Sequence, residues 1–174
     1  IGKMTELMDD VLILGKLTSG NVDFKPQEID LVHFCKKLVQ EFNDMQTDGR
    51  NMDFVIEGEP YSVYLDPRLL THSLSNLFSN AFKYSLGKEN PKLTVFYRLK
   101  EFQLTIEDYG IGIPKGEMPS LFQPFFRANN VTEIKGTGLG LSIAQEYIEV
   151  NKGRLTASST EEIGSSFKIS FKKE

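Results

Sequence analysis

One segment, residues 66–84, constrains the fold of this chain more than any other, because it predicts a helix with two chemically different faces. Asp66 can accept hydrogen bonds as an N-cap, and Pro67 suits the first helical position, where its missing N–H does no harm. At about 100° per residue, one face gathers apolar side chains, namely Leu70, Leu74, Leu77, Phe78 and Ala81. A separate polar stripe carries Asn76, Asn80 and Lys83. The helix therefore has one face for a core and another for chemistry.

Strand and helix patterns surround this helix without strict alternation. Helical patterns cover residues 1–17, most of 28–45, and the stretch from Gly140 to about Asn151. Strand patterns cover residues 52–59, 62–66, 92–100, 102–108, 154–160 and 165–171. Such a mixture predicts an α+β domain with helices on one face of a mixed sheet, rather than a doubly wound parallel sheet.

Two local details of this arrangement can be predicted. We expect the strands at 52–59 and 62–66, which Gly58 and Pro60 separate, to form a hairpin or a neighbouring pair. We also expect Gly153 to take the left-handed conformation that ends the last helix.

The first helical pattern carries an apolar stripe at three- and four-residue spacings: Ile1, Met4, Met8, Val11 and Leu12. The stripe suits a helix packed on its own domain or a helix paired with another chain, and two heptads do not decide between them. Because the chain enters this pattern at once, we expect a fragment of a longer protein.

Composition excludes several classes of function. The chain has 174 residues, 40% of them hydrophobic, which suffices for one well-buried core. A net charge of -4 without blocks of like charge argues against a nucleic-acid surface. The single cysteine, Cys35, excludes an internal disulfide and a cysteine-based metal cluster. With no membrane-spanning run and no signal-peptide pattern, we expect a cytoplasmic segment without direct membrane contact.

Three alternate glycines, Gly136, Gly138 and Gly140, precede the last predicted helix. Glycine lets backbone N–H groups approach a ligand closely, and a helix N-terminus adds partial positive charge and free donors. The pattern predicts an anion site, while a mobile linker is the plain alternative. Its spacing matches neither the P-loop nor the dinucleotide G-x-G-x-x-G pattern.

Two further groups could bind a nucleotide. Asp108 ends a predicted strand before Gly110 and Gly112, and a carboxylate suits the exocyclic amino group of adenine, although D-x-G-x-G alone is often an ordinary turn. Asn80 offers the kind of oxygen that Mg2+ prefers, and Lys83 lies beside it on the same helix. In isolation, Asn76, Asn80 and Lys83 would be the solvated edge of an amphipathic helix.

Together, these motifs resemble a known family. "NLFSNAFKYS", "DYGIGIP", "LFQPFFR" and "GTGLGLS" occur in the order and rough spacing of the N, G1, F and G2 boxes of sensor histidine kinases, within the Bergerat-fold ATPase superfamily. "GSSF" also resembles the last glycine motif of the family. The resemblance covers the chain from about Asp23 to its end. It implies a two-layer α/β sandwich with a mostly antiparallel sheet and a mobile ATP lid.

The resemblance also implies a role for each matching residue. Asn80 would be the magnesium ligand, and Asn80, Lys83 and Arg127 would act on the phosphates. Phe122, Phe125 and Phe126 would anchor the lid. The residues that would bind ATP are Asn76, Asn80, Lys83, Tyr84, Asp108, Gly110, Gly112, Ile113, Phe122, Gly136, Thr137, Gly138, Leu139, Gly140 and Leu141.

The family transfers the γ-phosphoryl group of ATP to a histidine that neither His33 nor His72 matches. The resemblance therefore places the acceptor upstream, with residues 1–22 as the end of a dimerisation helix and residues 23–174 as the catalytic domain. Its implied partners are ATP, the upstream domain in a homodimer, and a response regulator whose aspartate receives the phosphoryl group. An ATP-gated conformational module, which phosphorylates nothing, is the alternative, and a domain that only binds nucleotide is a third.

Overall fold

The computed structural model describes residues 2–20, 22–131 and 134–173. Its elements follow the chain as α1 (Gly2–Thr18), β1 (Gln27–Ile29), α2 (Leu31–Met45), β2 (Asp53–Glu57), β3 (Val63–Leu65), α3 (Pro67–Tyr84), β4 (Lys92–Tyr97), β5 (Glu101–Asp108), η1 (Lys115–Ser120), η2 (Asn129–Val131), α4 (Gly140–Val150), β6 (Arg154–Thr160) and β7 (Gly164–Lys172). Over these described ranges, every helix is too short or too polar to cross a membrane.

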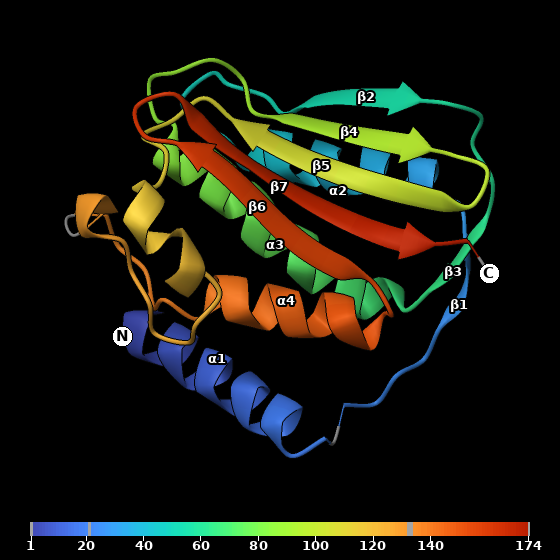
Figure 1. The fold of residues 1–174 in the computed structure, drawn as a ribbon, viewed down its shortest axis with the longest axis horizontal. Helices are drawn as coiled ribbons and strands as arrows, with labels where there is room; N and C mark the ends of the chain where they lie inside the picture. The colour runs from blue at the N-terminus through green and yellow to red at the C-terminus, as the bar shows by residue number, and fades with distance from the viewer. Residues whose placement is uncertain (1, 21, 132–133, 174) are drawn as a thin grey trace.

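Five strands form the main sheet in the order β2-β4-β5-β7-β6, and α2, α3 and α4 lie together on one of its faces (Figure 1). β2 and β4 run parallel, and the other neighbours run antiparallel. β1 and β3 pair separately as a two-stranded antiparallel sheet. The prediction of helices on one face of a mixed, mostly antiparallel sheet is confirmed.

The core lies between the main sheet and these helices. The five apolar residues predicted for the core face of α3 are all buried there: Leu70, Leu74, Leu77, Phe78 and Ala81. The helix begins as predicted, with the Asp66 side chain accepting from the Arg68 N–H and with Pro67 in the first position. The separate polar stripe of α3 is therefore held in a defined direction.

The predicted pairing of residues 52–59 with 62–66 is wrong. β2 pairs in parallel with β4, and β3 joins β1 in the small sheet. Gly58 shows why the chain does not reverse between them. Its φ is +87°, and a Cβ on it would lie 2.2 Å from the carbonyl oxygen of Tyr97 at the end of β4. The chain thus crosses closely over that strand end and leaves the sheet.

The end of α4 also differs from the prediction, because Lys152 and not Gly153 takes the left-handed conformation, with φ +61°. The Lys152 N–H donates to the Glu149 carbonyl, and the Gly153 N–H donates to the Ile148 carbonyl, both at 2.8 Å, as in a Schellman motif. Gly153 is needed for space instead, since a Cβ on it would lie 2.5 Å from the Phe171 ring.

The helix α1 runs beside α4 (Figure 1) and packs on it through a different face from the predicted stripe. A second apolar cluster joins Ile13, Leu14 and Leu17 of α1 to Leu69, Leu139, Ile143 and Tyr147. Met8, Val11 and Leu12 of the predicted stripe are exposed instead. Ile1 and the side chain of Met4 lie outside the described residues. Two apolar patterns overlap in this helix, and packing on α4 buries the one that contains Ile13, Leu14 and Leu17.

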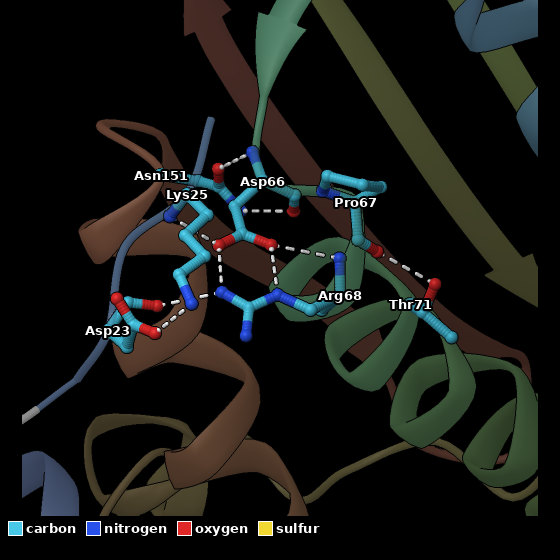
Figure 2. A network of polar contacts seen from close by, with 7 residues as sticks. All are labelled: Asp23, Lys25, Asp66, Pro67, Arg68, Thr71 and Asn151. Carbon is cyan, nitrogen blue, oxygen red and sulfur yellow. Dashed lines mark hydrogen bonds and ion pairs between the residues drawn. The ribbon is translucent and has the colours of Figure 1, made fainter. Parts of the chain in front are cut away.

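A polar network at the start of α3, drawn in Figure 2, ties three parts of the chain together. The fully buried Asp66 carboxylate accepts from the Lys25 backbone N–H and from Arg68 Nη2, both at 2.7 Å. The Asp66 N–H donates to Asn151 Oδ1, at the end of α4, at 2.7 Å. Burial raises the pKa of Asp66, but the hydrogen bonds from Arg68 and Lys25 outweigh it and hold the pKa below its ordinary value.

Candidate functional site

The polar face of α3 and the glycine-rich segment before α4 enclose a cavity of about 180 Å³, called the α3–α4 cavity below. The end of β5, the start of β7 and the segment from Ile111 to Val131 complete its wall. The motif residues of α3, of the segment after β5 and of the glycine-rich segment lie far apart in the sequence, but the fold places them around this one cavity. It is therefore the site that the sequence motifs predict.

The polar side chains of α3 that are predicted to act on phosphates lie directly against the glycine motif. A Cβ built on Gly136 would lie 2.9 Å from Lys83 Nζ, and one on Gly140 would lie 3.2 Å from Asn76 Oδ1. Lys83 Nζ also lies 4.8 Å from the centre of the Tyr84 ring. The Lys83 ammonium group and the Asn76 amide oxygen thus face the segment that leads into α4, where free backbone donors and partial positive charge favour an anion.

Asp108 supplies an acceptor at another part of the cavity wall. It lies at the end of β5, is 6% exposed, and its Oδ1 accepts a hydrogen bond from the Gly110 N–H at 2.9 Å. Burial raises the pKa of Asp108 to about 6, although hydrogen bonds from the Gly110 and Ser165 N–H groups oppose this shift. The carboxylate is ionised at neutral pH and can accept from a donor in the cavity.

Gly110 explains how Asp108 and α3 come so close. A Cβ on Gly110 would lie 2.1 Å from the Tyr84 carbonyl oxygen, which also accepts from the Ile111 N–H at 3.1 Å. No side chain fits between the end of α3 and the segment after β5. The glycine therefore allows the two motifs to share one wall of the cavity.

The glycine motif interlocks with the "FQPFF" segment. Gly138 has φ +76°, and a Cβ on it would lie 2.8 Å from the backbone carbonyl carbon of Phe125. Phe125 itself has φ +65°, an uncommon conformation for a bulky residue, and its side chain is 60% exposed. Phe126 lines the cavity. The two segments thus close over the cavity as one packed unit.

Arg127 lines the cavity, but in this structure its guanidinium braces its own segment. Its Nη2 donates to the Val131 carbonyl at 2.8 Å and also to the Ile134 carbonyl. The same segment is held by the Asn129 N–H, which donates to Glu117 Oε2 at 3.0 Å. The contact of Arg127 with phosphate stays a prediction.

Most of the predicted site residues line the α3–α4 cavity: Asn76, Asn80, Lys83, Tyr84, Asp108, Gly112, Ile113, Arg127, Gly136, Thr137, Gly138, Gly140 and Leu141. Gly110, Phe122 and Leu139 do not line it. Gly110 lies behind the wall, and Phe122 packs on the main core. Leu139 is fully buried in the second apolar cluster, which joins α1 to α4. These three support the site rather than face it.

Sequence reasoning missed several lining residues, among them Asp10, Ser79, Asn130 and Ser165. Ser165 could have been found, because it belongs to the "GSSF" motif. Asp10 carries no such signal, since it lies 127 positions from Thr137, whose Oγ1 donates to Asp10 Oδ2 at 2.9 Å.

Both histidines are exposed on helices, and neither lines the α3–α4 cavity. His33 is exposed near the start of α2, where its backbone N–H donates to Asp30 Oδ1 at 2.9 Å. His72 is exposed on α3, with its ring centre 5.6 Å from that of Tyr147. Neither is part of the candidate site.

A second cavity of about 630 Å³ lies beside the small sheet and the ends of α4 and β7. It is larger than the α3–α4 cavity, but none of the predicted site residues lines it. The convergence of motif residues and the buried Asp108 carboxylate identify the smaller cavity as the functional candidate.

The comparisons with known sequences point to one family. A family model described as "Histidine kinase-, DNA gyrase B-, and HSP90-like ATPase" matches residues 65–174. The sensor protein kinase WalK of Staphylococcus haemolyticus is 31% identical over 96% of this chain and 28% of the relative. The sensor histidine kinase WalK of Bacillus subtilis is 31% identical over 99% of this chain and 29% of the relative. The chain spans less than a third of the length of these relatives.

Solved structures share the fold. The histidine kinase AdeS of Acinetobacter baumannii aligns with a TM-score of 0.79 and 24% identity, over 99% of this chain and 80% of that chain. Full-length ShkA in complex with AMPPNP aligns with a TM-score of 0.86 and 18% identity, over 99% of this chain and 36% of that chain. The nucleotide-free catalytic domain of the histidine kinase ThkA aligns with a TM-score of 0.71 and 25% identity, over 86% of this chain and 98% of that chain.

Proposed function

Because the chain belongs to the family of histidine kinase-, DNA gyrase B- and HSP90-like ATPases, we propose that it is the ATP-binding catalytic domain of a sensor histidine kinase. The domain would bind ATP and position its γ-phosphoryl group for transfer to a histidine of the full-length protein. We keep residues 1–22 as the end of a dimerisation helix and 23–174 as the catalytic domain. The activity takes place in the cytoplasm, where ATP is supplied.

One observation carries this proposal: a buried carboxylate, the amide and ammonium groups of α3, and the N-terminus of α4 all converge on one cavity. Asp108 would accept a hydrogen bond from the adenine amino group, while Gly112 and Ile113 leave room for a flat ring. Lys83 and the backbone N–H groups around Gly138 would hold the phosphate chain. Each end of ATP thus meets groups of complementary chemistry.

The residues present also fit a magnesium ion that is shared with phosphate oxygens. Asn80 directs an amide-bearing side chain to the cavity, and the described residues contain no cluster of three or more His, Cys, Asp or Glu side chains that would hold a metal alone. Asn80 would supply an oxygen ligand, and the bound ion would neutralise charge on the triphosphate. The protein's own part is to orient the phosphates with Lys83 and to exclude water.

The α3–α4 cavity has a smaller volume than the roughly 300–1,000 Å³ of typical ligand pockets. We infer that the part of the wall from Lys115 to Val131 moves outward to admit ATP and then closes over it as a lid. Arg127, which now donates to carbonyls of its own segment, would become free to reach the phosphates when these bonds break.

The catalytic function is tested by transfer of labelled phosphate between two forms of the protein. This chain is mixed with magnesium, γ-labelled ATP and a longer form that includes the upstream residues but carries Asp108→Asn, so that it cannot label itself. We expect acid-labile, base-stable label on the longer form, because phosphohistidine has this stability. This chain with Asp108→Asn serves as the control and should transfer none.

If ATP binds but no label moves, even to an unmutated longer form, the domain is an ATP-gated conformational module instead. If label does reach the longer form, an added response regulator should take it up on its aspartate, as the kinase proposal requires.

Adenosine affinity is expected to depend on pH through Asp108. Because its pKa is about 6, the carboxyl is ionised above pH 6 and protonated below it. The amino group of adenine donates more strongly to the ionised form, so affinity is full at pH 7.5 and falls by up to about tenfold per pH unit below pH 6. Calorimetry with adenosine at pH 7.5, 6 and 5 checks this, and proton release at the lowest pH should accompany binding. A constant affinity over this range would contradict the raised pKa of Asp108, and an unchanged affinity in Asp108→Asn as well would exclude Asp108 as the acceptor.

A further inference from the structure

The helix α1 places a carboxylate in the wall of the α3–α4 cavity. Asp10 lines the cavity, and its Oδ2 accepts a hydrogen bond from Thr137 Oγ1 at 2.9 Å. The same hydroxyl oxygen accepts from the Leu139 N–H at 3.2 Å, so its proton is directed toward Asp10. The carboxylate is therefore held against the glycine motif, where the phosphate chain of a nucleotide would lie.

Packing of α1 fixes this position. Asp10, Ile13, Leu14 and Leu17 follow the i, i+3, i+4, i+7 spacing of one helix face. The three apolar members pack in the cluster that contains Leu139, Ile143 and Tyr147 of the α4 region. Asp10 continues this face by one turn, which brings it to the loop immediately before α4.

The segment that follows α1 is also anchored. As Figure 2 shows, the Asp66 carboxylate accepts from the Lys25 N–H, and Arg68 Nη2 donates to the Asp23 carbonyl at 2.8 Å. Contacts both along α1 and just after it thus hold Asp10 in place. The Asp10 contact follows from the docked position of the helix.

The charge of Asp10 opposes a phosphate ligand. Among the residues that the structure describes, those with charged side chains that line the cavity are Asp10, Lys83, Asp108 and Arg127. Lys83 faces Gly136, beside Thr137, whereas Arg127 donates to carbonyls of its own segment. A carboxylate bound to the middle residue of the glycine motif repels each negative charge that a phosphate chain brings there.

We propose that Asp10 is a specificity-determining residue of the nucleotide site, which lowers affinity in step with the number of phosphate charges while α1 is docked on α4. This inference rests on the proposed function of the α3–α4 cavity. Because coupling between sites is reciprocal, ATP binding also weakens the docking of α1, whereas adenosine does not. The position of the N-terminal helix thereby sets the affinity of the domain for ATP.

Calorimetry with adenosine, ADP and ATP tests the proposal on this chain, with magnesium and again with EDTA. Asp10→Asn removes the charge but keeps an oxygen that can accept from Thr137. We expect it to tighten ATP binding by about three- to tenfold at 0.1 M salt, ADP binding less, and adenosine binding by less than about twofold. The increase should be larger in EDTA, where ATP carries more charge.

The matched control is Asp9→Asn, which makes the same charge change at an exposed neighbour on α1 that does not line the cavity. It should alter all three affinities by less than about twofold, because exposed charges farther away are screened by salt. As a second readout, amide exchange of Ile13 to Leu17 in the unmodified chain should speed up with ATP but not with adenosine.

Equal changes in the affinity of Asp10→Asn for all three ligands would show a structural role and overturn the proposal. Unchanged affinities would also overturn it. Weaker ATP binding by Asp10→Asn only with magnesium would make Asp10 a metal ligand and also overturn it. If the unmodified chain binds none of the three ligands, the proposed function fails and this inference falls with it. If it binds them and the charge dependence is absent, only the role of Asp10 fails.

Discussion

The Asp108→Asn variant is expected to lose adenine nucleotide binding by about 100-fold or more while it keeps its fold. The loss corresponds to about 3 kcal/mol, because a charge-assisted hydrogen bond disappears and an amide N–H2 group can face the adenine amino group, donor against donor. The fold should persist, since asparagine has the same shape and its oxygen can still accept from the Gly110 N–H. Removing a buried carboxylate whose pKa is raised should not by itself destabilise the domain.

Calorimetry with ATP and with adenosine measures this loss, and circular dichroism with thermal melting checks the fold. The matched control is Glu107→Gln, because Glu107 precedes Asp108 on β5 but pairs with Lys92 at 2.9 Å instead of lining the cavity. Its nucleotide affinity should stay within about twofold of the unmodified chain, as expected for a partly exposed ion pair. Full affinity in Asp108→Asn would move the adenine site elsewhere.

The second large effect is expected at Asp66, on the stability of the fold. Asp66→Ala should lower the free energy of unfolding by about 2–4 kcal/mol, because it removes the buried N-cap of α3 and leaves donors around it without an acceptor, although the Arg68 side chain is itself half exposed. The Lys25 N–H would lose its acceptor, and the Arg68 guanidinium would lose its two hydrogen bonds to the carboxylate. Since the same carboxylate caps α3, the start of that helix would also fray.

Urea unfolding followed by circular dichroism measures this change. Asp23→Asn is the matched control, because Asp23 pairs with Lys25 in the same network (Figure 2) but both side chains are exposed. It should cost less than about 1 kcal/mol. A loss at Asp66 no larger than that at Asp23 would mean that the network does not hold the fold. If Asp66→Ala loses stability while its folded fraction keeps its nucleotide affinity, the network stabilises the fold and does not act on the nucleotide site.

Local patterns predicted the elements well where one periodicity dominates. The helix from Pro67 to Tyr84, its cap and its buried face agree with the structure because capping and 3.6-residue periodicity act within a few residues. Most of the motif residues also line one cavity, as the family resemblance implied. The roles that it implied for Asn80, Lys83 and Arg127 stay predictions.

Three predictions failed where distant contacts decide. β2 pairs with β4 rather than β3, since Gly58 carries the chain over the carbonyl of Tyr97. Gly153 provides room for Phe171, while Lys152 adopts the left-handed turn. In α1, burial against α4 favours Ile13, Leu14 and Leu17 over the exposed stripe. In each case, the partner lies outside the local window from which the pattern was derived.

By itself, the sequence determined the helices, most strands and the chemistry of the motif residues, because these depend on neighbours along the chain. Only the tertiary structure decided which strands pair, which face of α1 is buried, and which further groups enter the cavity. Asp10 is the clearest case, since nothing near it in the sequence distinguishes it from Asp9. Packing of α1 on α4 brings it to Thr137 across 127 positions, and a contact of that separation depends on the whole fold.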